Sequence, residues 1–173
     1  PGSLVSSLGA GVLTVGMLAF AARILTPSDE PLSGCAIPDK GMGPFVEVPS
    51  PSPFLAKVFV PKERVGQSDA YHLLIHFHGG EPVRKLLALE DFDYVLATID
   101  RGNGSSAYQG SVKDRKAWDE LLAGIDDHVT RAMGREMKRD DVVVSAWSAG
   151  YKATEELLKV TPADPAFPGL VLL

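Results

Sequence analysis

One stretch, Asp141 to Lys159 (DVVVSAWSAGYKATEELLK), constrains the fold of this chain more than any other. Its three consecutive valines, Val142 to Val144, predict a strand that is covered on both faces. The pattern then becomes that of a helix, which leaves Ser148 at a sharp corner between the two elements. Small residues bracket this corner: Ala146, Ala149 and Gly150. They are needed there because the backbones on either side of such a corner approach closely, so we expect the Ser148 hydroxyl to stand exposed above a sheet.

The helix after the corner offers hydrogen-bond donors beside that hydroxyl. The first N–H groups of a helix have no partner within it, so the N–H of Ala149 is available to a developing oxyanion. A second set of donors follows an earlier apolar segment, Tyr71 to Phe77 (YHLLIHF), which ends at His78-Gly79-Gly80. Two glycines directly after a strand let the backbone turn tightly and bring N–H groups near a ligand.

The two motifs resemble those of the α/β-hydrolase fold. The segment AWSAG, residues 146–150, is similar to the G-x-S-x-G nucleophile motif of that fold, with alanine in place of the first glycine. The segment HGG, residues 78–80, looks like its oxyanion loop, and it precedes the nucleophile in the chain as it does in the family. Together with the GNGSSAY segment, the motifs are similar to those of bacterial proteins of this fold, and the resemblance covers about residues 54–173.

This resemblance implies a serine hydrolase, esterase-like or lipase-like, that cleaves esters through a seryl acyl-enzyme. It implies Ser148 as the nucleophile and Gly79, Gly80 and Ala149 as the oxyanion hole. The substrate would be a small ester or a related acyl compound, and neither a metal nor a cofactor is required. We expect the pocket to be lined by the residues next to these motifs: His78, Trp147 and Tyr151.

The order of elements predicts an α/β fold with a mostly parallel, doubly wound sheet and helices on both faces. Strands alternate with helices from Tyr71 onward, which favours parallel strands joined by right-handed crossovers. Four segments are expected as neighbouring central strands: Tyr71 to Phe77, Tyr94 to Ile99, Val142 to Ala146 and Gly169 to Val171. Ser111 with Asp114 resembles a capping box that opens a long amphipathic helix. Three carboxylates that flank the second of these strands are interpreted as solvated strand ends: Asp91, Asp93 and Asp100.

The chain has 173 residues, of which 45% are apolar, and this is enough for one sizeable core. We divide it into a signal peptide or membrane anchor (1–25), a linker with loops (26–53) and a partial α/β-hydrolase domain (54–173). The first assignment rests on residues 4–22, which carry no charge and are about as long as a bilayer core is thick. It predicts a secreted, periplasmic or membrane-anchored protein. The net charge of −5 argues against nucleic acid as a partner.

The general base that Ser148 needs is missing from this sequence. In α/β-hydrolases the catalytic acid and then the histidine follow the nucleophile along the chain. All four histidines precede Ser148: His72, His76, His78 and His128. We therefore expect the acid and the histidine to lie beyond residue 173, the C-terminal part of the domain to be absent, and the 173-residue chain to be inactive by itself.

Two other functions are open at this point. His76 and His78 form an H-x-H pair whose spacing suits a divalent metal, as in a metal-dependent hydrolase built on a closed barrel. Alternatively, the chain is a non-catalytic α/β-hydrolase-like binding module, with a pocket but no triad.

Overall fold

The computed structural model describes residues 46–48, 56–89, 92–112, 114–161 and 169–172, all within the unit Ile37–Leu173. The strands are β1 (Val46–Val48), β2 (Ala56–Phe59), β3 (Ala70–Phe77), β4 (Val95–Ile99), β5 (Lys138–Ala146) and β6 (Gly169–Leu172). The α-helices are α2 (Lys62–Val65), α3 (Gly80–Leu89), α4 (Arg115–Met133) and α5 (Tyr151–Val160), and two short 3₁₀ helices are η1 (Ser105–Tyr108) and η2 (Ser148–Gly150).

The strands form one mostly parallel sheet in the order β1-β2-β4-β3-β5-β6. β4, β3, β5 and β6 run parallel to one another, and β1 and β2 add an antiparallel edge next to β4. The α/β fold class with a mostly parallel sheet and helices on both faces, expected from the sequence, is confirmed. The four segments predicted as neighbouring central strands are neighbours, but β6 lies at the edge of the described sheet and is not central. The sheet is an open series of strands, so the barrel that the metal-dependent alternative requires is not formed by the described strands.

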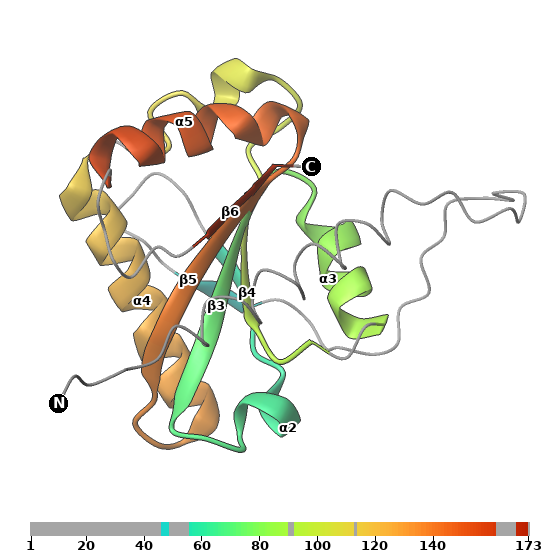
Figure 1. Cartoon of the computed structure of the whole chain (residues 1–173), viewed down its shortest axis with the longest axis vertical. Helices are drawn as coiled ribbons and strands as arrows, with labels where there is room; N and C mark the ends of the chain where they lie inside the picture. Colours follow the sequence, from blue (N-terminus) through green and yellow to red (C-terminus); the bar gives the residue numbers. More distant parts are fainter. Residues whose placement is uncertain (1–45, 49–55, 90–91, 113, 162–168, 173) are drawn as a thin grey trace, which may run out of the picture. The chain divides into compact units, whose positions relative to one another are not determined.

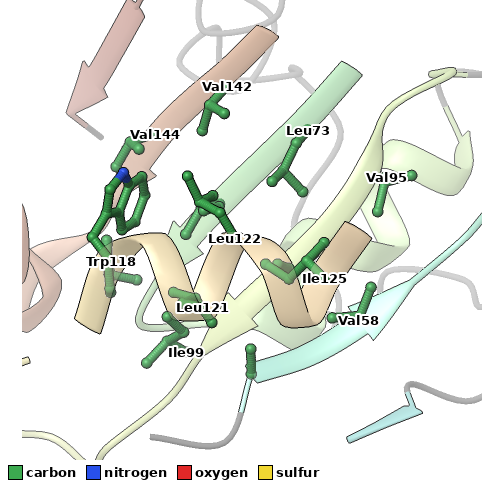
Figure 2. Packing of buried hydrophobic residues seen from close by; sticks show 14 of the residues in the cluster. Val58, Leu73, Val95, Ile99, Trp118, Leu121, Leu122, Ile125, Val142 and Val144 are labelled. Atoms are coloured by element: carbon green, nitrogen blue, oxygen red, sulfur yellow. The ribbon is translucent and has the colours of Figure 1, made fainter. Parts of the chain in front are cut away.

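Helix α4 covers one face of the sheet, and its sequence explains why. Its apolar residues recur at the helical period, and five of them are buried: Trp118, Leu121, Leu122, Ile125 and Val129. Figure 2 shows this stripe lying over alternate residues of the strands, among them Leu73, Val95 and Val142. Successive side chains of a strand point to opposite faces, so these residues form a single layer under α4. Three buried residues of α5 and the corner before it join the same core: Ala149, Ala153 and Leu157.

Helix α3 lies along β3 and β4 on the opposite face (Figure 1). Its Val83, Leu87 and Ala88 are buried but stand outside the core cluster under α4. The strand residues on the α3 face include the polar His76, Thr98 and Ser145, all of them buried. Helices cover both faces of the sheet. A site can therefore form at the carboxyl ends of β3, β4 and β5, from the loops that follow these strands.

The structure corrects the prediction for the start of α4. Asp114 is itself the N-cap, and its carboxylate accepts the N–H of Ala117 at 2.9 Å. The Ser111 hydroxyl instead donates to the carbonyl of Tyr108. A carboxylate is as good an N-cap as a hydroxyl, so the capping-box pattern was read three residues too early.

Residues 4–22, predicted as a signal peptide or anchor, lie outside the described residues. In the part of the chain that the structure describes, no helix has both the length and the apolarity needed to cross a membrane.

Candidate active site

Ser148 lies at the corner between β5 and α5, in a backbone conformation that residues other than glycine rarely adopt. Its φ is 47°, in the left-handed region, and its side chain is exposed. The residue before it remains tied to the sheet, because the N–H of Trp147 donates to the carbonyl of Phe77 at 3.1 Å. A left-handed residue other than glycine costs about 1–2 kcal/mol, which the surrounding structure must offset. The corner therefore holds a strained, exposed hydroxyl at the carboxyl edge of the sheet.

Gly150 shows why this corner needs small residues. A Cβ atom built on Gly150 would lie 2.2 Å from the carbonyl oxygen of Phe77 and 2.9 Å from its Cβ. No side chain fits at such distances, so α5 can begin this close to β3 only with glycine at that position. Ala149, one residue earlier, is 4% exposed and packs into the core.

The segment His78-Gly79-Gly80 lies beside this corner. His78 has φ 72° and Gly79 has φ 84°, so two successive residues are left-handed, and Gly80 already begins α3. A Cβ on Gly79 would lie 2.8 Å from Cε3 of Trp147, so the Trp147 ring packs directly on the Gly79 backbone. The two motifs recognised in the sequence, far apart along the chain, thus meet in space.

The N–H groups of this loop are held by a carboxylate that the sequence interpretation missed. The N–H of Gly79 donates to Oδ1 of Asp100 at 2.6 Å, and that of Gly80 is shared between both oxygens at 3.3 Å each. The N–H of His78 donates to the carbonyl of Ile99. Asp100 is an exposed strand end, as interpreted from the sequence, but the sequence interpretation missed that it also holds the loop. β3 and β4 are parallel neighbours, so Asp100, just past the end of β4, reaches the turn just past the end of β3.

His76 lies in β3 directly beneath the loop and is fully buried. Its Nε2 is 2.6 Å from the carbonyl oxygen of His78, and its Nδ1 is 2.7 Å from the Ser145 hydroxyl. Burial lowers the pKa of His76 to about 4, against smaller opposing effects of the His78 carbonyl and the Asp100 charge. The ring is therefore neutral near pH 7.

The His78 side chain turns toward η1. Its Nδ1 is 3.1 Å from the hydroxyl of Tyr108, and that hydroxyl accepts the N–H of Arg101 at 2.9 Å. Tyr108 is fully buried, and burial raises the pKa of its hydroxyl, which stays protonated. Glu156 of α5 accepts the N–H groups of Gly110 at 2.7 Å and Ser111 at 3.1 Å and so fixes the segment that follows Tyr108. The sequence analysis assigned no role to Glu156, and it noted Tyr108 only as part of the GNGSSAY segment, because both act through contacts with distant segments.

Two large aromatic side chains flank Ser148 at the surface. Trp147 is 50% exposed and Tyr151 is 41% exposed, and the ring centroid of His78 lies 6.4 Å from that of Trp147. The three residues predicted to line a pocket are therefore neighbours in sequence or in space of the candidate nucleophile. The exposed aromatic rings provide apolar surface beside the strained hydroxyl.

The H-x-H pair does not form a metal site within the described residues. Both ring nitrogens of His76 are engaged by protein groups, and the His78 ring is directed to Tyr108. Across the described ranges, no three His, Cys, Asp or Glu side chains are grouped as ligands of a metal ion would be.

None of the four histidines is hydrogen-bonded to Ser148. His72 lies near the start of β3, at the other end of the strand, with its Nδ1 2.7 Å from Asp141, and His128 belongs to the middle of α4. His76 is buried and His78 contacts Tyr108. No histidine among the described residues is therefore placed by a hydrogen bond to act as the base of Ser148.

Comparison with solved structures finds similar chains, among them two esterases. The chain is similar to enterochelin esterase from Shigella flexneri, with a TM-score of 0.41 and 15% identity over 68% of this chain and 34% of that one. It is also similar to an inhibited esterase B from Lactobacillus rhamnosis, with a TM-score of 0.44 and 16% identity over 93% of this chain and 55% of that one. The chain thus spans about a third of the first structure and just over half of the second. No protein-family model and no curated protein matches it.

Proposed function

We propose that the protein is a serine hydrolase that cleaves small esters through a seryl acyl-enzyme, with Ser148 as the nucleophile. The observation that carries the proposal is the conformation of Ser148: a left-handed residue with an exposed hydroxyl, where β5 turns into a helix. Strain of this kind persists at sites where function requires the geometry. A strand-to-helix corner with a protruding serine is the arrangement of a nucleophile elbow.

In the proposed reaction, the Ser148 hydroxyl oxygen attacks the acyl carbonyl while a general base accepts its proton. The carbonyl oxygen becomes an oxyanion, which accepts hydrogen bonds from the N–H of Ala149 and from the loop. Of the two loop glycines, Gly80 is the better donor, because its N–H is shared at 3.3 Å whereas that of Gly79 is committed to Asp100 at 2.6 Å. The alcohol leaves, and water then hydrolyses the seryl ester.

Steady-state hydrolysis of p-nitrophenyl acetate by the whole protein tests this proposal. Ser148→Ala should reduce kcat at least about 1000-fold, since the reaction has no other covalent acceptor. Ser106→Ala is the matched control, because Ser106 is another exposed serine at the same edge of the sheet. Equal loss in both variants, or activity that survives in Ser148→Ala, would contradict the proposal.

A non-catalytic binding module is the second candidate. It is favoured by one observation: the Ser148 hydroxyl has no hydrogen-bond partner in the part of the chain that the structure describes, while Asp100 already accepts from both loop glycines. Such a module would not turn over p-nitrophenyl acetate. A folded wild-type protein with no Ser148-dependent hydrolysis would support it.

A further inference from the structure

A row of buried polar side chains crosses the sheet beneath the loop. Thr98 of β4, His76 of β3 and Ser145 of β5 are partners in the parallel register, on the face covered by α3. Their exposed fractions are 1%, 0% and 5%, so water does not solvate them. Polar groups at this depth cost stability unless they are hydrogen-bonded, so the buried imidazole of His76 needs partners for its ring nitrogens.

The hydrogen bonds of His76 assign a hydrogen to one particular ring nitrogen. The His78 carbonyl oxygen can only accept, so the Nε2 atom 2.6 Å from it carries the hydrogen. The ring is neutral, because burial keeps its pKa low, and Nδ1 therefore has a free lone pair. The Ser145 hydroxyl, 2.7 Å from Nδ1, is the donor to that lone pair. The His78 carbonyl thus selects the tautomer in which His76 points an N–H at the loop, and the Ser145 hydroxyl holds the ring in that orientation.

The carbonyl that His76 holds belongs to the peptide between His78 and Gly79, where two successive residues are left-handed. For His78 this conformation is strained, and it persists only where the surroundings over-determine it. The N–H of the same peptide donates to Asp100 at 2.6 Å. The peptide is therefore clamped at both ends, at its oxygen by His76 and at its nitrogen by Asp100.

We propose that His76, oriented by Ser145, is a positioning residue for the oxyanion loop: it holds the His78–Gly79 peptide in the orientation that the loop needs in order to stabilise an oxyanion. The inference rests on the proposed hydrolase function. His76 does not touch the reacting atoms and acts only through the loop. A peptide released from the clamp can rotate, and the adjoining N–H groups then lose their alignment.

The kinetic test compares three variants of the whole protein with p-nitrophenyl acetate as the substrate. His76→Leu removes the N–H that holds the loop, whereas His76→Gln keeps an amide donor in its place. Thr98→Val is the matched control: it alters the same buried row, but the Thr98 hydroxyl has no hydrogen-bond partner among the described residues. Far-ultraviolet circular dichroism confirms that each variant is folded.

His76→Leu should lower kcat by about 10- to 100-fold and leave KM within about 3-fold of the wild-type value. A misaligned oxyanion loop weakens the stabilisation of the transition state but has little effect on substrate binding. His76→Gln should recover most of the lost kcat, and Thr98→Val should match the wild type. A folded His76→Leu with wild-type kcat, or a His76→Gln no better than His76→Leu, would overturn the positioning role.

A second measurement does not depend on activity, and it serves also if His76→Leu fails to fold. Nitrogen-15 NMR of the histidine-labelled wild-type protein near neutral pH should report Nε2 of His76 protonated and Nδ1 unprotonated. Ser145→Ala removes the hydrogen bond to Nδ1, so it should loosen the His76 ring and speed the exchange of the Gly79 amide. A protonated Nδ1 in the wild type would overturn the clamp, whereas a correct tautomer in a protein without hydrolytic activity would count against the proposed function alone.

Discussion

At the scale of single residues, the candidate site depends on positions that tolerate only one kind of side chain. Gly150 is the strictest of them, because a methyl group there would meet the carbonyl of Phe77 at 2.2 Å. The clash is with backbone at the end of a central strand, which cannot move aside as the tip of a flexible side chain can.

We expect Gly150→Ala to lower the free energy of unfolding by about 3 kcal/mol, the upper end of the usual cost of overpacking. Urea unfolding followed by circular dichroism measures this. Gly104→Ala is the control, since the atom closest to its added Cβ would be a side-chain oxygen 3.6 Å away. Equal midpoints for the two variants would mean that α5 and β3 are not packed as described.

His76 links stability to pH. Its pKa is lowered from 6.5 to about 4 in the folded chain, so the unfolded chain binds more protons between these values. The contribution of neutral, buried His76 to the free energy of unfolding is therefore present above about pH 6.5 and is lost as the pH falls toward 4. From this group alone we expect a loss of about 2 kcal/mol between pH 7.5 and pH 5.

The matched variant for this prediction is His76→Gln, which cannot titrate. The difference in unfolding free energy between the wild type and His76→Gln should change by that amount over the same pH range, in urea titrations at each pH. Parallel pH profiles for the two proteins would show that His76 is not buried in the neutral form.

At the scale of elements, the termini of helices and strands are decided by local hydrogen bonds. Helix α4 begins where the Asp114 carboxylate accepts the N–H of Ala117, and it ends at Gly134, whose φ is 67°. An N-cap side chain is worth about 1 kcal/mol. Asp114→Ala should therefore cost about that much in unfolding free energy. Asp114→Asn, which keeps a capping oxygen, should cost much less, and equal losses from the two substitutions in urea titrations would contradict the assigned cap.

The sequence was sufficient to predict most elements and insufficient to predict the contacts between their ends. Hydrophobic periodicity identified β3, β4, β5 and α4, and the small residues around Ser148 identified the corner, because these signals are local. The contacts of the loop were missed because Asp100 lies 21 positions from Gly79 and Tyr108 lies 30 from His78. Only the parallel pairing of β3 with its neighbours brings such residues together. The sequence analysis placed the start of β5 at Val142, four residues late. The first four residues of β5 are polar, so no hydrophobic pattern marks them as a strand, although they pair with the start of β3.

At the scale of the whole molecule, β3 is the strand on which the site depends. It is paired with β4 on one side and β5 on the other, and Leu73, Ile75 and Phe77 are completely buried. The segments that exchange amide hydrogens most slowly are those that open only on global unfolding. We expect the amides of residues 73–77 to be in this class and those of the short helix α2 to exchange much faster, in hydrogen–deuterium exchange read by NMR. Similar rates in the two segments would contradict a sheet centred on β3.

The same arrangement explains why two motifs about 70 residues apart in sequence can form one site. β3 and β5 are neighbours and parallel, so the turn after β3 and the corner after β5 emerge side by side at one edge, where Trp147 packs on Gly79. Whether this edge performs nucleophilic chemistry is the central claim. Fluorophosphonate labelling followed by peptide mass spectrometry tests it most directly, because the probe forms a stable phosphonyl ester only with an activated serine. The account predicts one adduct per chain of the whole protein, on Ser148, that is absent in Ser148→Ala and retained in Ser106→Ala. A folded wild-type protein that forms no adduct, or an adduct that persists in Ser148→Ala, would contradict it.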